Sequence, residues 1–147
     1  MKLVDANILL YAVNEDAPLH RPARSWLEGA LSGTETIAFC WSVLLAFVRL
    51  STRTAVFPRP LSIEEAFDLV ESWLSQPCVT MAHPTERHAR VLRELLAPLG
   101  TAGNLPTDAH LAALALEHGA EMCSCDRDFA RFPGLRWMNP LESRTRK

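Results

Sequence analysis

The chain has 147 residues, of which 48% are hydrophobic and 22% are charged, and its formal net charge is −2 at pH 7. We interpret residues 1–147 as one domain, because this length suits a single hydrophobic core. The composition excludes a disordered or fibrous chain. It also excludes a globally basic protein, so any contact with nucleic acid would need a local cationic patch.

No apolar run approaches the roughly 18 to 20 residues of a membrane span, and the acid at position 5 comes too early for a signal peptide. We therefore expect a cytoplasmic protein with no membrane partner. The cysteines have a spacing that suits neither zinc nor a disulfide framework, and we expect reduced, mostly buried thiols. They are Cys40, Cys78, Cys123 and Cys125.

Strand-like and helical patterns alternate along the chain. In order, we expect a strand at 2–4, helices at 8–13 and 21–31, a strand at 36–41, helices at 43–50 and 62–74, a strand at 78–82, helices at 85–96 and 107–118, and strands at 121–125 and 135–138. The helices have apolar residues at helical spacing. Ser42 and Thr85 are expected to act as helix caps, and Ser62 with Glu65 has the form of a capping box.

This alternation predicts right-handed βαβ units and a mainly parallel sheet covered by helices on both faces. The fold class expected is α/β, a three-layer α/β/α sandwich.

Acids follow the predicted strands where a parallel sheet binds its ligands, at the carboxyl ends. Asp5 ends the first strand, Asp126 follows the strand at 121–125, and Asp108 lies in the first turn of the helix at 107–118. Each has a local alternative. Asp5 could cap a helix, Asp108 could complement a helix dipole, and Asp126 with Asp128 could be turn residues.

Converging carboxylates repel one another unless a cation neutralises them, which favours a hard divalent ion such as Mg²⁺. Zinc would call for Cys or His ligands, which are absent at these positions. The chemistry implied is phosphodiester hydrolysis by a metal-activated water. An aspartyl-phosphate phosphatase would need a second acid two residues after Asp5, where the chain has Asn7.

Five segments together resemble the PIN-domain ribonucleases, and among these the VapC toxins of VapBC toxin-antitoxin pairs. They are LVDANILLY at 3–11, WSVLLAFVR at 41–49, GNLPTDAHLAALA at 103–115, SCDRDFARF at 124–132 and NPL at 139–141. The resemblance spans nearly the whole chain. It implies a PIN-like fold and a magnesium-dependent endoribonuclease toxin, with Mn²⁺ as an alternative cation.

The resemblance also implies residue roles and partners. Asp5 and Asp108 would be the chief metal ligands, Asp126 a third catalytic acid and Asp128 a supporting one, with Asn7 and Ser124 orienting them by hydrogen bonds. The expected partners are an RNA substrate, a small antitoxin protein whose segment covers the acidic pocket, and a second copy in a homodimer.

One position departs from the family pattern. PIN nucleases commonly carry a glutamate where this chain has Ala46, and no acid occurs between residues 36 and 59. Fewer carboxylates weaken metal binding, so a slow nuclease or a catalytically silent module that binds RNA or protein is the alternative. Glu15 or Asp16 would compensate if the loop after the first helix folded over the site.

Cationic and aromatic side chains have the chemistry to contact RNA. Arg127, Arg131 and Arg136, with the basic tail at 144–147, are candidates for phosphate contacts, and the alternative is a solvated surface. We assign no RNA role to the tryptophans, which are more often core or interface residues. They are Trp26, Trp41, Trp73 and Trp137. His110 is expected to be a partly exposed helix residue, not a ligand.

Overall fold

The computed structural model describes residues 1–101, 103 and 105–142. Five parallel strands form one sheet in the order β3-β2-β1-β4-β5. The strands are β1 (Lys2–Val4), β2 (Ile37–Phe39), β3 (Val79–Met81), β4 (Glu121–Cys123) and β5 (Trp137–Met138). The helices are α1 (Ala6–Val13), α2 (His20–Leu31), α3 (Trp41–Ser51), α4 (Ile63–Leu74), α5 (His88–Leu96) and α6 (Pro106–His118), with 3-10 helices η1 (Ala97–Leu99) and η2 (Arg127–Arg131).

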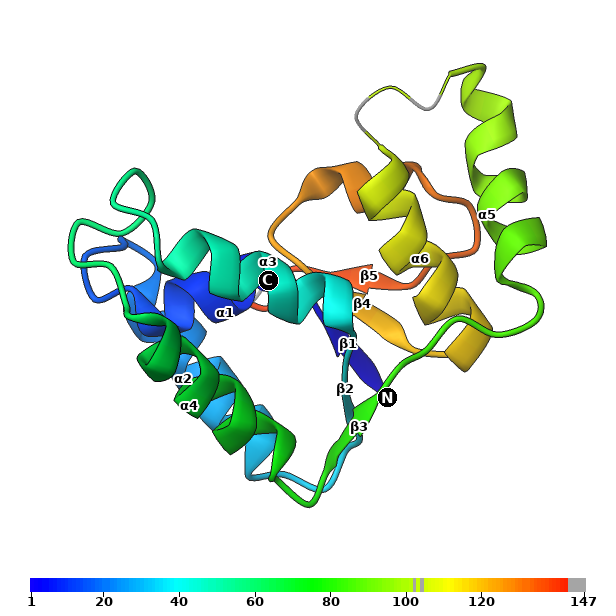
Figure 1. Ribbon diagram of the computed structural model, residues 1–147. Helices are drawn as coiled ribbons and strands as arrows, with labels where there is room; N and C mark the ends of the chain where they lie inside the picture. The colour runs from blue at the N-terminus through cyan, green and yellow to red at the C-terminus, as the bar shows by residue number, and fades with distance from the viewer. Residues whose placement is uncertain (102, 104, 143–147) are drawn as a thin grey trace, which may run out of the picture.

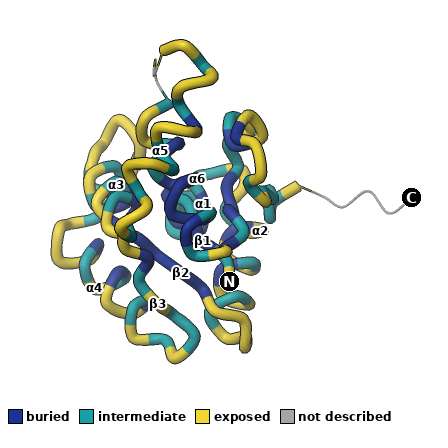
Figure 2. The backbone as a smooth tube through the Cα atoms, turned by 90° about the vertical axis from the view of Figure 1, so that its right-hand side faces the viewer, coloured by how far each residue is buried: buried dark blue, intermediate teal, exposed yellow. Residues whose placement is uncertain are grey.

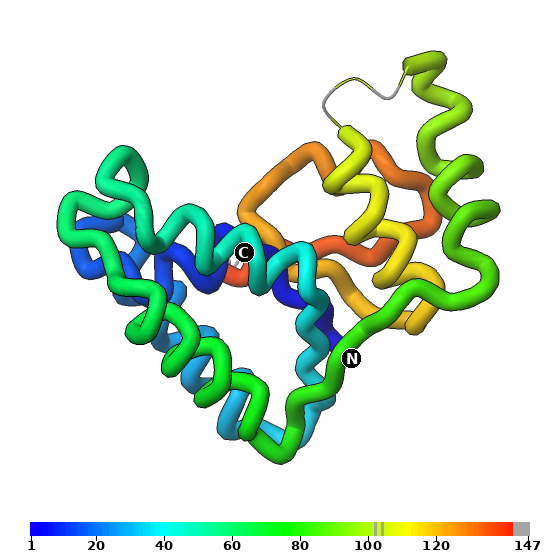
Figure 3. Tube along the Cα trace, in the orientation of Figure 1, coloured from blue at the N-terminus to red at the C-terminus, as the bar shows by residue number. Residues whose placement is uncertain are grey.

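The strand order determines which face each helix covers. From β1 the chain steps outward to β2 and then to β3, and right-handed crossovers put α1 to α4 on one face (Figure 1). It then returns across the sheet to β4, which puts α5 and α6 on the opposite face. Figure 3 shows this return as the segment that leaves β3 and passes to the side of α5. The predicted three-layer α/β/α architecture is confirmed.

The core lies between the sheet and the two helical layers. The tube in Figure 2 is buried along β1, β2 and α6 and exposed along the outer helices. The indole of Trp73 packs against Phe39 and Phe47, with ring centroids 6.3 and 4.9 Å away, as expected of a core tryptophan. Seven residues of α6 are buried, from Ala109 to Glu117, so this helix is held against the core along most of its length.

Two expected caps are wrong. The residue that caps α3 is Cys40, and Ser42 lies inside the first turn of that helix. Thr85 is not the N-cap of α5, which is Arg87. Its hydroxyl oxygen still accepts from the backbone N–H of Arg87 at 3.2 Å, while its own backbone N–H and hydroxyl donate to the buried Glu117 carboxylate. The capping box of Ser62 and Glu65 is present as predicted.

The four cysteines are free thiols. Cys40 and Cys123 are buried, and burial raises the pKa of Cys123 to about 12, so this thiol stays uncharged. Within the described residues, no helix is long and apolar enough to cross a membrane.

Candidate metal centre

The candidate acids lie between β1 and β4, where the connections switch from one face of the sheet to the other. Strands β1 and β4 are neighbours, but the chain leaves β1 toward α1 and enters β4 from α6 on the opposite face. Open α/β sheets bind ligands at such a switch point, beyond the carboxyl ends of the strands. Asp5 follows β1, Asp126 follows β4, and Asp108 lies in the first turn of α6.

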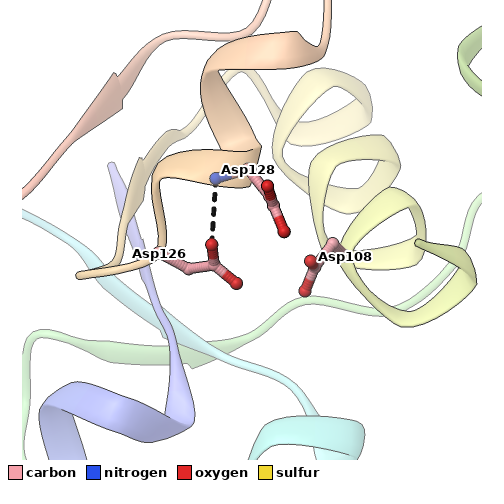
Figure 4. A group of neighbouring side chains, drawn as sticks. All are labelled: Asp108, Asp126 and Asp128. Atoms are coloured by element: carbon pink, nitrogen blue, oxygen red, sulfur yellow. Dashed lines mark hydrogen bonds between the residues drawn. The ribbon is translucent and has the colours of Figure 1, made fainter. Parts of the chain in front are cut away.

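Three carboxylates form the tightest group. Oxygen atoms of Asp108, Asp126 and Asp128 all lie within 4.8 Å of one another, and all three side chains are partly buried. Figure 4 shows them pointing toward a common space, with α6 supplying Asp108 and the segment after β4 supplying the other two. The backbone N–H of Asp128 donates to Asp126 Oδ1 at 2.9 Å, which fixes these two acids relative to each other.

Asp5 lies beside this group and is held by the two residues expected to orient it. The hydroxyl of Ser124, which is fully buried, donates to Asp5 Oδ2 at 2.7 Å. The same hydroxyl oxygen accepts from Asn7 Nδ2 and from the backbone N–H of Asp126, each at 3.0 Å. Asn7 Oδ1 in turn accepts from the backbone N–H of Cys125 at 3.3 Å. One serine thus links the ends of β1 and β4.

The local roles considered for the acids coexist with their convergence. Asp5 is the N-cap of α1 and accepts from the backbone N–H of Ala6 at 2.7 Å. Asp126 is likewise the N-cap of η2. Because caps fix side-chain torsions, they hold these carboxylates where the neighbouring acids meet them.

Electrostatic strain concentrates at Asp108. Burial, together with the charges of Asp126, Asp5 and Asp128, raises the pKa of Asp108 to about 6. The pKa of Asp5 is also raised, mainly by burial, although its hydrogen bonds from Ser124 and Ala6 oppose the rise. Four carboxylates that repel one another could together hold a divalent cation.

Two arginines expected near the acids differ in their surroundings. Arg131 Nε lies 3.6 Å from Asp128 Oδ1, so its guanidinium borders the acid group. Arg127 is exposed and pairs with Glu142 at 3.4 Å. Arg136 precedes β5 and donates to the carbonyl of Gly119, at the other end of the sheet. The tail at 144–147 and Asn104 of the third motif lie outside the described residues.

The acids considered as substitutes for the missing glutamate do not join the group. Glu15 and Asp16 instead pair with Arg59, at 3.6 and 3.4 Å, in a separate pocket beyond the end of α1. The expected compensation is therefore wrong. Ala46 is partly buried on α3 and packs against the core.

His110 lies apart from the acid group, as expected. It faces α5, where its Nδ1 is 2.9 Å from Nε2 of His88, and His88 Nδ1 contacts the carboxylate of Glu117. This cluster joins α5 to α6 and so supports the helix that carries Asp108.

A further polar side chain, Ser42, lies at this edge of the sheet. The sequence suggests it only as a helix cap. Register pairs Leu3 with Ala38, so Cys40 lies level with Asp5 on the adjacent strand. The hydroxyl of Ser42 is 3.2 Å from Cys40 Sγ. The available signal was a hydroxyl residue just beyond the end of a predicted strand.

Together, the parallel sheet and the acids at its switch point define an α/β protein with a carboxylate-lined site of the divalent-metal type. A sequence model described as PIN domain matches residues 2–135. The chain belongs to the PIN-domain family, which confirms the resemblance carried by the five motifs.

Relatives and solved structures agree with this assignment. Ribonuclease VapC37 of Mycobacterium tuberculosis (strain ATCC 25618 / H37Rv) is 53% identical over 140 residues, which cover 95% of this chain and 97% of the relative. Ribonuclease VapC33 of the same strain is 41% identical over 141 residues, covering 96% and 99%. The fold is similar to that of VapBC2 from Rickettsia felis bound to a promoter DNA fragment, with a TM-score of 0.68, 22% identity and coverage of 94% and 97%. It is also similar to that of Mycobacterium tuberculosis VapC20, described as a Sarcin-Ricin loop cleaving toxin, with a TM-score of 0.64, 19% identity and coverage of 92% and 99%.

Proposed function

We propose that the protein is a magnesium-dependent endoribonuclease and the toxin of a type II toxin-antitoxin pair, with Mn²⁺ as an alternative cation. The observation that carries this proposal is the convergence of Asp108, Asp126 and Asp128 beside Asp5 at the switch point of a PIN-domain sheet. Relatives that cover nearly the whole chain are named VapC ribonucleases, which supports RNA as the substrate.

The charge on the site supports a cation as its ligand. Asp5 and Asp108 are the metal ligands in this proposal, Asp126 is the third catalytic acid and Asp128 supports them. The pKa of Asp108 is raised mainly by burial and further by the charges of Asp126, Asp5 and Asp128, and a divalent cation would oppose both effects by favouring the ionised carboxylates. The chemistry supplied by a bound cation is polarisation of a water and neutralisation of charge on the phosphate oxygens.

The remaining residues position these acids and the substrate. Ser124 holds Asp5 through its hydroxyl, and Asn7 fixes Ser124 and the backbone of Cys125. Arg131 borders the acids through Asp128, and Arg127 is exposed in the same 3-10 helix; we assign both of them contacts with RNA phosphates.

We infer that a small antitoxin covers the acidic site and that the toxin forms a homodimer. The support is that proteins of the same fold include VapBC complexes from Rickettsia felis and from nontypeable Haemophilus influenzae. A segment that occupies the acid group would block both the cation and the RNA backbone, which explains how one partner could silence the enzyme.

The second candidate is a catalytically silent RNA- or protein-binding module, and Ala46 favours it because a carboxylate is missing from the family pattern. A thermal-stability titration with Mg²⁺ separates the two functions, since a cation that binds only the folded state raises Tm. The nuclease requires a Tm increase that Asp5→Asn abolishes. A Tm unchanged up to millimolar Mg²⁺ and Mn²⁺ would favour the silent module.

A further inference from the structure

The indole of Trp41 is exposed at the edge of the sheet that carries the acids. Trp41 is the first residue of α3 and keeps 46% of its surface accessible, whereas the core residue Trp73 keeps 7%. A tryptophan offers a large flat apolar face, and leaving it in water gives up the free energy of burying it. Such exposure is expected where the ring contacts a ligand.

The backbone places this ring close to the strand that ends in Asp5. Strands β1 and β2 are hydrogen-bonded neighbours, about 5 Å apart. The register that pairs Leu3 with Ala38 puts Asp5 and Cys40 at matching positions just beyond the ends of β1 and β2, and Trp41 is the next residue along the chain. The charge of Asp5 reaches Cys40, where it adds to the effect of burial in raising the pKa of that thiol. Trp41 therefore begins α3 beside the edge of the sheet that carries Asp5.

A protein surface is the competing interpretation. Leu45 lies one turn beyond Trp41 on the same helix face and is 57% exposed, so the two form an apolar stripe. A protein partner would bury both side chains. A nucleobase would stack on the aromatic ring alone, and Trp41 begins α3 at the acid-bearing edge of the sheet, whereas Leu45 lies one turn further along the helix. This difference in position favours the nucleobase.

The sequence alone assigns no RNA role to the tryptophans, but from its exposure and place in the fold we propose that Trp41 is the base-stacking residue of the site. On it an unpaired nucleobase of the RNA stacks within one or two nucleotides of the phosphate held at the acids. The proposal rests on the ribonuclease function above. Stacking on an aromatic side chain requires a base that is not paired in a duplex, so it selects single-stranded or loop RNA. Because every base has an aromatic face, Trp41 contributes affinity for unpaired RNA of any sequence.

The test compares Trp41→Ala, Trp41→Phe and Leu45→Ala in the full chain. The probes are a mixed-sequence single-stranded RNA oligonucleotide and a fully paired duplex of the same length, measured for binding and for cleavage with Mg²⁺. Trp41→Ala is expected to weaken single-strand binding about 5- to 160-fold, the effect of losing one stacked base. It should raise KM and leave kcat nearly unchanged, because the reacting groups stay in place. Trp41→Phe should retain most of the affinity, and Leu45→Ala should bind like wild type.

Three results would overturn the inference. The first is an unchanged KM in Trp41→Ala. The second is an equal loss in Leu45→Ala accompanied by a change in oligomeric mass, which would assign the stripe to a protein contact. The third is a loss in Trp41→Phe as large as that in Trp41→Ala, which would mean that the ring acts through the fold. If wild type itself neither binds nor cleaves RNA, the ribonuclease proposal fails, and that outcome is distinct from an active wild type that tolerates Trp41→Ala.

Discussion

Ser124 and Asp5 lie 119 positions apart in sequence, yet the serine hydroxyl donates to the aspartate carboxylate at 2.7 Å. The serine is fully buried, and its oxygen also accepts from Asn7 and from the backbone of Asp126. This hydroxyl therefore sets the separation between the acid of β1 and the acids after β4.

Ser124→Ala should destabilise the fold by about 1–3 kcal/mol, because it leaves several polar groups without their partner. It should also weaken Mg²⁺ binding, since Asp5 loses a hydrogen bond that opposes the rise in its pKa. Urea denaturation and a Mg²⁺ titration measure the two effects. The exposed Ser75→Ala is the matched control, with an expected change within about 0.5 kcal/mol. Equal stability of the two variants would contradict this role.

The stability of the metal-free protein should depend on the ionisation of Asp108. Its pKa in the folded protein is about 6, above the value of about 3.9 for an unfolded chain. A carboxyl with a raised pKa contributes stability at low pH that is lost as pH rises through its folded pKa. In chelator, Asp108→Asn should therefore gain Tm relative to wild type as pH increases from about 4 to 7. Saturating Mg²⁺ should reverse this difference, and parallel Tm curves in chelator would argue against the strain at Asp108.

Ala46→Glu should increase Mg²⁺ affinity and the rate of RNA cleavage. The substitution supplies the acid of the family pattern, and more carboxylate ligands bind a hard cation more tightly. Leu45→Glu is the control, because this neighbouring side chain is mostly exposed and adds the same charge to α3. If the two variants bind Mg²⁺ equally, the family position does not contribute a ligand here.

Arg131→Ala and Arg127→Ala should each reduce the salt dependence of RNA binding. Loss of one phosphate contact lowers the slope of log affinity against log salt by about 0.7 for a single strand. Arg24→Ala is the control, since Arg24 is exposed on α2 and pairs with Glu28 in its own helix. If both variants have the same salt-dependence slope as wild type, neither arginine contacts an RNA phosphate and both are solvated surface residues.

The architecture was predictable from local signals. The helices follow apolar residues at helical spacing, and the capping box of Ser62 and Glu65 is present where the sequence predicts it. The boundaries that failed depend on tertiary partners. Thr85 accepts from the backbone N–H of Arg87 as a cap would, but it also donates to Glu117, 32 positions later, and α5 begins only at His88.

The site was predictable only in part, for a similar reason. A parallel sheet brings the carboxyl ends of its strands to one edge, which is enough to expect Asp5, Asp108 and Asp126 together. Spacing could not indicate that Asp128 would complete the tightest group. Nor could the spacing indicate that Glu15 would form a salt bridge with Arg59, because these contacts depend on how the loops pack.

The central claim is that these acids act as one cation-dependent site that cleaves RNA. Its most direct test is cleavage of a mixed structured-RNA pool by the purified protein with Mg²⁺, with chelator, and with Asp108→Asn in parallel. We expect discrete products that require both the cation and Asp108. Equal inactivity of wild type and variant, with RNA or a protein partner still bound, would contradict the claim and identify a silent binding module.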